Sequence, residues 1–218
     1  MKKEFWLERW ERAETGFHEG VVNAYLMQYW QELYLARDSR VFVPLCGKSV
    51  DMQWLMQQGH PVVGVELSEI AVQAFFGENG YTPVVSTRDK FRQYEANNIR
   101  ILCGDFFDLK RDDLAGVSAV YDRASMVALP PEMRLGYVQH LLNILPPKTQ
   151  ILLITFDYPQ AEMPGPPFAL DAAEVEALFR EKADIKLLVQ FDMLAQNPRF
   201  QQRGLTRLQE SIYLLTLK

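Results

Sequence analysis

Cysteine and histidine are scarce in this chain. Its 218 residues include two cysteines, Cys46 and Cys103, and three histidines, His18, His60 and His140. The cysteines stand far apart in apolar segments, which gives neither a disulfide framework nor the spacing of metal ligands. The histidines share no ligand spacing either, and we read them as ordinary surface or loop residues. The sequence therefore predicts two reduced, buried, inert thiols and no metal site.

Long apolar runs and an excess of positive charge are also missing. No segment approaches the roughly 20 consecutive apolar residues that span a bilayer. The opening stretch MKKEFWLERWER lacks the apolar centre of a signal peptide. A net charge of -5 disfavours binding to nucleic acid or anionic lipid through bulk charge. We expect a cytoplasmic protein, monomeric by default, whose partner is a small molecule and which binds neither nucleic acid nor membrane.

Short apolar runs alternate with helix-period segments in most of the chain. Seven runs are rich in Val, Ile and Leu, at residues 40–45, 61–66, 99–103, 117–122, 150–156, 185–193 and 209–218. The first five are apolar on both faces, as in a parallel sheet that is covered on both sides. A short loop before the last run predicts an antiparallel final strand. The pattern predicts an α/β fold with a doubly wound, mostly parallel seven-stranded sheet.

Helical periodicity fills most of the remaining segments. We predict helices at residues 4–14, 21–35, 50–59, 68–80, 131–145 and 171–181. Ser68 can cap one of them, and Gly59 can end another. The length of the chain fits one globular domain. We expect an N-terminal helical segment at residues 1–38 and a Rossmann-like core at residues 39–218.

The turn after the first apolar run, FVPLCGKS at residues 42–49, raises the question of a phosphate site. A P-loop fails because Phe42 stands where the first glycine must be, and a dinucleotide fingerprint fails because only Gly47 is present. A nucleoside cofactor without phosphates, such as S-adenosylmethionine, needs one flexible turn and an acid for its ribose. Glu66 stands 19 residues after Gly47, which suits that role. The alternative is that Glu66 only caps the helix that begins at Ser68.

Two residues after the third run extend this candidate site. Asp105 can accept a hydrogen bond from an adenine amino group, and Phe106 can line the ring; Asp105 can equally be a helix cap. Ligands of open α/β sheets bind beyond the carboxyl ends of the strands. We therefore expect Leu45, Glu66, Asp105 and Arg123 to converge there.

Five stretches of the chain carry a family resemblance. They are F-V-P-L-C-G-K-S-V-D-M-x-W-L, G-H-P-V-V-G-V-E-L-S, Y-D-R-A-S-M-V-A-L-P, P-G-P-P-F and the final Y-L-L-T-L-K. In order and spacing the chain resembles the thiopurine S-methyltransferase family, and its short loops are similar to the bacterial form. The resemblance implies a class I methyltransferase fold, S-adenosylmethionine as donor and an aromatic or heterocyclic thiol as acceptor.

The resemblance also implies roles for single residues. Those expected to contact or border the cofactor are Trp10, Leu45, Glu66, Asp105, Phe106 and Arg123. Trp10 belongs to the N-terminal segment that covers the cofactor in this family, and Phe17 falls where the substrate ring packs. Arg199 falls near a late substrate-side arginine, but NPRFQQRG departs from the family pattern and Arg203 competes for the role.

Arg123 is the candidate catalytic residue. Methyl transfer from a sulfonium is an in-line displacement that requires alignment and exclusion of water. Because many heteroaromatic thiols ionise near neutral pH, a general base is optional. Arg123 is expected to favour the thiolate or to orient a water that takes its proton; an ion pair with Asp122 is the structural alternative.

Two other functions remain open. The physiological acceptor can instead be a selenium or tellurium compound, in a metalloid detoxification role that the resemblance also implies. The second alternative belongs to a different class: a non-catalytic nucleotide-binding module that has the same sheet but catalyses no reaction. The presence of both Glu66 and Arg123 speaks against the second alternative.

Overall fold

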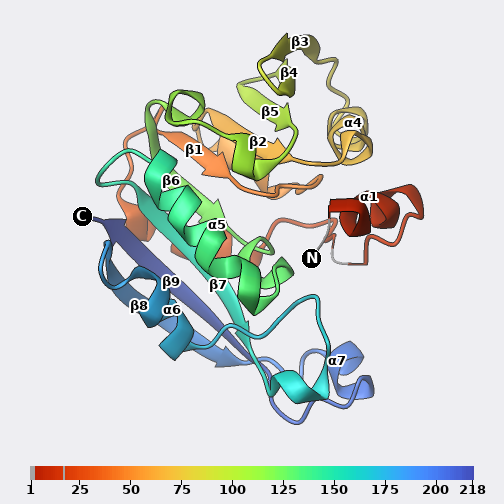
Figure 1. The fold of residues 1–218 in the computed structure, drawn as a ribbon, viewed down its shortest axis with the longest axis vertical. Helices are drawn as coiled ribbons and strands as arrows, with labels where there is room; N and C mark the ends of the chain where they lie inside the picture. The colour runs from red at the N-terminus through yellow and green to blue at the C-terminus, as the bar shows by residue number, and fades with distance from the viewer. Residues whose placement is uncertain (1–2, 17) are drawn as a thin grey trace. The chain divides into compact units, whose positions relative to one another are not determined.

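The computed structural model describes residues 3–16 and 18–218, which form two compact units (Figure 1). Unit 1 comprises Met1–Tyr121 and Ile144–Pro146, and unit 2 comprises Asp122–Asn143 and Pro147–Lys218. Within the described residues, no helix has the length and apolar character needed to cross a membrane.

Unit 1 contains a mixed sheet in the order β3-β4-β5-β2-β1-β6. The parallel part is formed by β1 (Arg40–Val43), β2 (Val62–Glu66), β5 (Ile99–Cys103) and β6 (Val117–Asp122). An antiparallel hairpin of β3 (Val84–Arg88) and β4 (Phe91–Ala96) extends it beside β5. All five residues of β2 are buried, as the prediction of a sheet covered on both faces requires.

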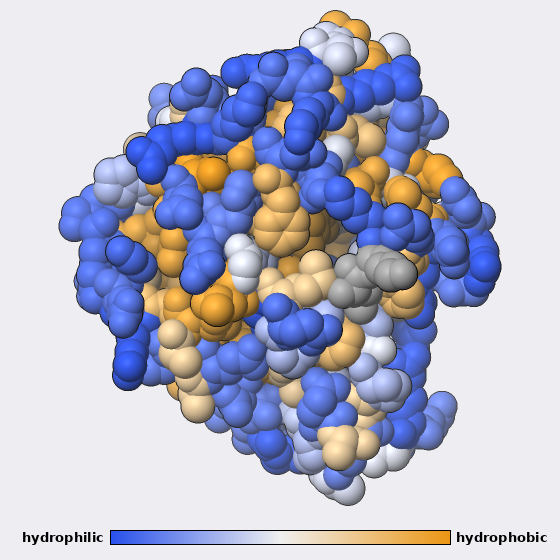
Figure 2. Space-filling model, in the orientation of Figure 1, coloured by the Kyte–Doolittle hydropathy of each residue, from blue (hydrophilic) through white to orange (hydrophobic). Residues whose placement is uncertain are grey.

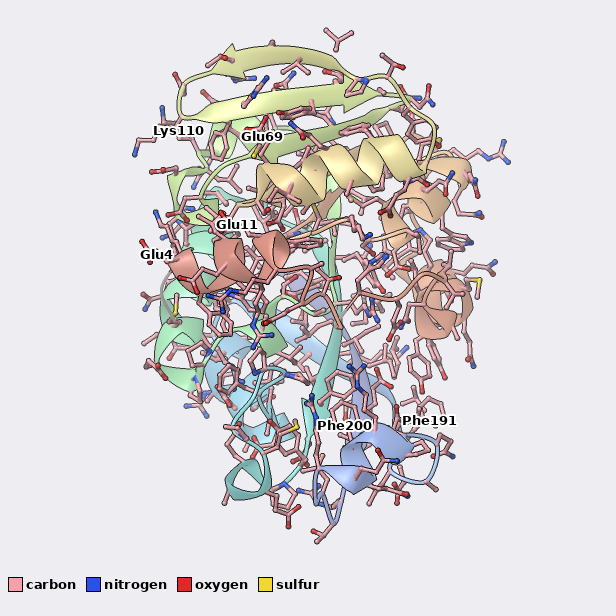
Figure 3. All side chains as sticks on the ribbon, turned by 90° about the vertical axis from the view of Figure 1, so that its right-hand side faces the viewer. Glu4, Glu11, Glu69, Lys110, Phe191 and Phe200 are labelled. Atoms are coloured by element: carbon pink, nitrogen blue, oxygen red, sulfur yellow. The ribbon has the colours of Figure 1, made fainter. Side chains whose placement is uncertain are left out.

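Two helices of unit 1 begin at residues whose side chains cap them, Asn23 and Ser68. The helices of this unit are α1 (Lys3–Glu11), α2 (Ala24–Tyr29), α3 (Asp51–Gln57) and α4 (Glu69–Glu78), with short 3-10 turns η1 (Trp30–Leu33), η2 (Phe106–Asp108) and η3 (Arg111–Leu114). Ser68 caps α4 by accepting a hydrogen bond from the Ala71 backbone N–H, as predicted. Figure 3 shows α1, which carries Glu4 and Glu11, beside α4, which carries Glu69.

Unit 2 contains three antiparallel strands in the order β7-β9-β8. These are β7 (Gln150–Asp157), β8 (Ala183–Asp192) and β9 (Gln209–Leu217), with helices α5 (Pro131–Ile144), α6 (Ala172–Phe179) and α7 (Pro198–Gln202) and 3-10 turns η4 (Met126–Ala128) and η5 (Gln160–Glu162). A small apolar cluster includes Tyr158, Met163 and Leu208, with Phe200 of α7 packed against it. The predicted antiparallel pairing of the last two strands is confirmed.

The predicted strand count of seven was too low, because the described residues form nine strands. The missing pair is the β3–β4 hairpin. Every residue of β3 is exposed, so its sequence lacks the apolar run or alternation that marks a half-buried strand. Figure 2 shows this end of unit 1 as a hydrophilic surface with a few hydrophobic residues. The predicted helix at 21–35 is also shorter, because Asn23 caps α2 and Tyr34 ends η1 in the left-handed region.

Candidate functional site

The turn that follows β1 has an unusual backbone. Leu45 has φ 44° and Gly47 has φ 52°, so two residues of the same short turn lie in the left-handed region. For a side chain as large as leucine this conformation is strained, and such strain persists where the surroundings impose it. The Cys46 backbone N–H donates to the Val65 carbonyl at 3.0 Å, which holds the turn against the end of β2.

Glu66 is joined to that turn. Its Oε2 accepts a hydrogen bond from the Gly47 backbone N–H at 2.8 Å, and its Oε1 accepts one from the Ser68 backbone N–H at 2.8 Å. The residue is only 6% exposed. Burial raises the pKa of the Glu66 carboxyl, and the hydrogen bonds from the Ser68, Gly47 and Leu67 backbone partly offset that rise. Glu66 therefore meets the Gly47 turn and also supports the start of α4.

Asp105 lies beside the same strand ends. The Gly104 backbone N–H donates to the Glu66 carbonyl at 2.8 Å, which brings the end of β5 to the end of β2. Asp105 Oδ1 accepts a hydrogen bond from the Phe107 N–H at 3.0 Å, so the residue is the cap of η2. Its Oδ2 forms an ion pair with Lys3 at the start of α1. Asp105 therefore caps η2, as the alternative prediction stated, and its carboxylate also contacts α1.

The two phenylalanines after Asp105 differ in burial. Phe106 is buried in the core of unit 1, whereas Phe107 is 42% exposed, and their rings meet edge to face with centroids 5.3 Å apart. Of the two, Phe107 has the larger surface for a ligand ring. The sequence prediction chose Phe106 because it directly follows the aspartate.

Trp10 packs against the Gly47 turn from α1. A Cβ atom placed on Gly47 would lie 3.2 Å from Cζ2 of the Trp10 ring, so the close approach depends on the glycine. Trp10 is the buried residue of α1. The N-terminal helix is thus joined to the strand ends at two points, through Trp10 at Gly47 and through Lys3 at Asp105.

Three predicted residues lie in unit 2 or outside the described chain. Arg123 is partly buried and directly follows β6. Arg199 is exposed on α7, and the guanidinium of nearby Arg203 lies 3.7 Å from the sulfur of Met163. Phe17 lies outside the described residues.

Asp51 is a buried carboxylate that the sequence reading missed. Its Oδ1 accepts a hydrogen bond from the Asn23 backbone N–H at 2.8 Å, and its Oδ2 accepts one from the Tyr121 hydroxyl at 3.0 Å. Asp51 begins α3, directly after the Gly47 turn. The only signal in the sequence is an acid in the first turn of a helix, which is too common to single it out.

The cysteines and histidines form no reactive or metal-binding centre in the part of the chain that is described. Burial raises the pKa of the Cys46 thiol well above its usual range and that of Cys103 to about 11. No group of three His, Cys, Asp or Glu side chains suited to a metal is found among residues 3–16 and 18–218. His60 lies in the loop between α3 and β2, where it is buried and accepts a 3.1 Å hydrogen bond from the Trp30 indole N–H.

These residues fit a nucleoside cofactor that carries no phosphate. Each oxygen of the Glu66 carboxylate accepts one backbone N–H and keeps further acceptor capacity, as two ribose hydroxyls require. The turn has one glycine where a pyrophosphate site would need several. Glu66 and Gly47 would hold the ribose, and Asp105 retains acceptor capacity for an amino group.

Comparison with known sequences identifies the family. The sequence model described as Thiopurine S-methyltransferase (TPMT) matches residues 1–218. A thiopurine S-methyltransferase of Nitrosospira multiformis is 65% identical over 215 residues, which cover 99% of this chain and 98% of that protein. One from Pseudomonas fluorescens is 47% identical over 218 residues, with complete coverage of both chains.

Solved structures agree on the fold. A S-adenosylmethionine-dependent methyltransferase from Anabaena variabilis has a TM-score of 0.68 at 15% identity and covers 99% of this chain and 95% of its own. A Burkholderia thailandensis 1,6-didemethyltoxoflavin-N1-methyltransferase, solved with S-adenosylhomocysteine, has a TM-score of 0.65 at 13% identity and covers 99% and 86%. The predicted class I methyltransferase fold is confirmed. The chain belongs to the thiopurine S-methyltransferase family, whose enzymes use S-adenosylmethionine as the methyl donor.

Proposed function

We propose that this protein methylates the sulfur of small aromatic or heterocyclic thiols, such as thiopurines, with S-adenosylmethionine as donor. The observation that carries the proposal is the buried Glu66 carboxylate, held against the Gly47 turn at the carboxyl ends of the parallel strands. That arrangement suits an adenosine without phosphates. The thiol acceptor is supported by the names of the relatives, all given as thiopurine S-methyltransferase.

The chain would contribute mainly alignment and exclusion of water. When bound, the cofactor supplies an electrophilic methyl group on a positively charged sulfur. Glu66 accepts hydrogen bonds from the ribose hydroxyls, and the buried Trp10 ring packs beside Gly47. A water-poor site strengthens each electrostatic contact and prevents hydrolysis.

Arg123 would act on the acceptor. A thiolate attacks far faster than a thiol, so a guanidinium that favours the anion raises the reactive fraction of the substrate. Arginine remains protonated at any physiological pH and can supply this charge throughout. In this proposal the proton leaves with solvent, and no residue of the chain acts as an obligatory general base. A cytosolic location is supported by the free thiols of Cys46 and Cys103.

The test follows S-adenosylhomocysteine released by the purified protein. It compares 6-mercaptopurine with hypoxanthine, in which oxygen replaces the thiol sulfur, and includes selenite as a separate acceptor. We expect product with the thiol and none with the oxygen analogue. No turnover of any aromatic thiol would refute the proposal, and faster turnover of selenite would make a metalloid compound the acceptor.

Calorimetry separates catalysis from simple nucleotide binding. S-adenosylhomocysteine should bind, while ATP should not, because the turn lacks a phosphate cradle. The reverse pattern would indicate a nucleotide-binding module.

A further inference from the structure

The last two residues of β6 each make a hydrogen bond between a tyrosine and a buried carboxylate. The Tyr121 hydroxyl donates to Asp51 Oδ2 at 3.0 Å within unit 1. Asp122 Oδ2 accepts a hydrogen bond from the Tyr137 hydroxyl of α5 at 2.6 Å within unit 2. Each of the two residues that lead into Arg123 is therefore held by a hydrogen bond within its own unit.

The turn after β6 is held by Asp122 as well. Asp122 Oδ1 accepts a hydrogen bond from the Met126 backbone N–H at 3.2 Å, and the Ser125 hydroxyl donates to the Arg123 carbonyl at 3.4 Å. Between them, Ala124 has φ 60°, in the left-handed region that residues other than glycine rarely adopt. A strained conformation of this kind is kept only where neighbouring contacts impose it, and it is frequent at functional sites.

The Asp122–Tyr137 pair is costly as a purely structural device. Asp122 is 1% exposed and Tyr137 is fully buried. Burial raises the pKa of Asp122 to about 6, and the hydrogen bonds from Tyr137, Met126 and Ser125 reduce that rise. Replacing both partners of a buried hydrogen bond by apolar groups of the same shape can be nearly neutral or even stabilising. The polar pair therefore calls for a reason other than stability.

We propose that Asp122 and Tyr137 are positioning residues that hold the Arg123 turn in its strained conformation. Tyr137 fixes the Asp122 carboxylate, and the carboxylate fixes the turn through the Met126 N–H. The inference rests on the proposed function, in which Arg123 favours the thiolate. It assigns no chemical step to either residue.

The test is a double-mutant cycle on the full-length enzyme with 6-mercaptopurine and saturating S-adenosylmethionine. Tyr137→Phe removes one hydroxyl and should lower kcat about tenfold, because a small displacement of a catalytic group has a large effect on rate. The dissociation constant of S-adenosylhomocysteine should stay unchanged. In an Arg123→Ala background, Tyr137→Phe should cause no further loss of kcat, because the group that it positions is gone.

Tyr213→Phe is the matched control, since Tyr213 is a buried tyrosine of β9 in the same unit. It should leave kcat unchanged. Asp122→Asn repeats the test if Tyr137→Phe does not fold, as judged by circular dichroism. An unchanged kcat in Tyr137→Phe or in its replacement Asp122→Asn, or an equal loss in the Arg123→Ala background, would overturn the inference.

A failure of the proposed function would give a different experimental result from a failure of this inference. If Arg123→Ala alone keeps the wild-type kcat, the role of Arg123 is wrong, and the inference falls with it. If Arg123→Ala lowers kcat but Tyr137→Phe does not, the inference alone is refuted.

Discussion

The Gly47 backbone N–H donates a 2.8 Å hydrogen bond to the side chain of Glu66, 19 residues further along the chain. The contact joins the turn after β1 to the end of β2, so the carboxylate and the turn form one structure. A change in either residue should therefore affect the orientation of the other.

Glu66→Ala should weaken binding of S-adenosylhomocysteine by about 1–3 kcal/mol, because it removes a charged acceptor from the ribose hydroxyls. Titration calorimetry measures the effect. Glu176→Ala, at an exposed position of α6, serves as the control and should leave the affinity unchanged. An unaltered dissociation constant in Glu66→Ala would remove the ribose role.

Gly47→Ala should destabilise the protein by about 1–2 kcal/mol, the cost of a left-handed conformation for a residue with a Cβ. The added methyl would also lie 3.2 Å from the Trp10 ring and displace it. Thermal unfolding and tryptophan fluorescence report the two effects. Gly20→Ala is the control, since a Cβ there meets nothing within 4 Å. Equal midpoints for both variants would contradict the assignment of strain to Gly47.

Asp122 should make stability depend on pH. Its pKa is raised to about 6, so the fold favours the protonated carboxyl. That contribution is fully present below the unfolded value of about 3.9 and is lost as pH rises through about 6. Relative to Asp122→Asn, the wild type should lose about 2 kcal/mol of unfolding free energy between pH 4 and pH 7. Urea unfolding at several pH values measures the difference, and parallel curves would contradict the prediction.

The two thiols should be unreactive in the folded protein. With a pKa of about 11 for Cys103, only about one molecule in a thousand carries the thiolate at pH 8. Cys46 is buried, and its burial raises the pKa of its thiol well above the usual range. Ellman's reagent should label the native protein slowly and label two thiols at once after denaturation. Rapid labelling of the native protein would indicate an activated cysteine.

The strands of the parallel sheet were predictable because strands that are buried on both faces consist of consecutive apolar residues. The predicted runs at 99–103 and 117–122 match β5 and β6, and the run at 61–66 differs from β2 by one residue. The β3–β4 hairpin left no such pattern. The hairpin is instead anchored by the pairing of β4 with β5 and by Glu69 of α4, which accepts hydrogen bonds from Arg92 and Tyr94.

The part of the candidate site that depends on the spacing of residues along the sequence was predictable. Glu66 follows Gly47 at a distance typical of a βαβ unit, and the two residues do meet. Asp51 could not be found in this way, because its partners Asn23 and Tyr121 lie 28 and 70 residues away. Sequence spacing likewise does not show which of Phe106 and Phe107 the fold buries.

The sequence alone determined the alternation of strands and helices, the lack of a phosphate cradle and the family motifs, because each depends on residues close together in the chain. Tertiary structure decided which carboxylates are buried, which backbone N–H groups they accept, and that Lys3 and Trp10 meet the strand ends. Those contacts join segments far apart in the chain, and only packing of the folded chain brings their atoms within hydrogen-bonding distance.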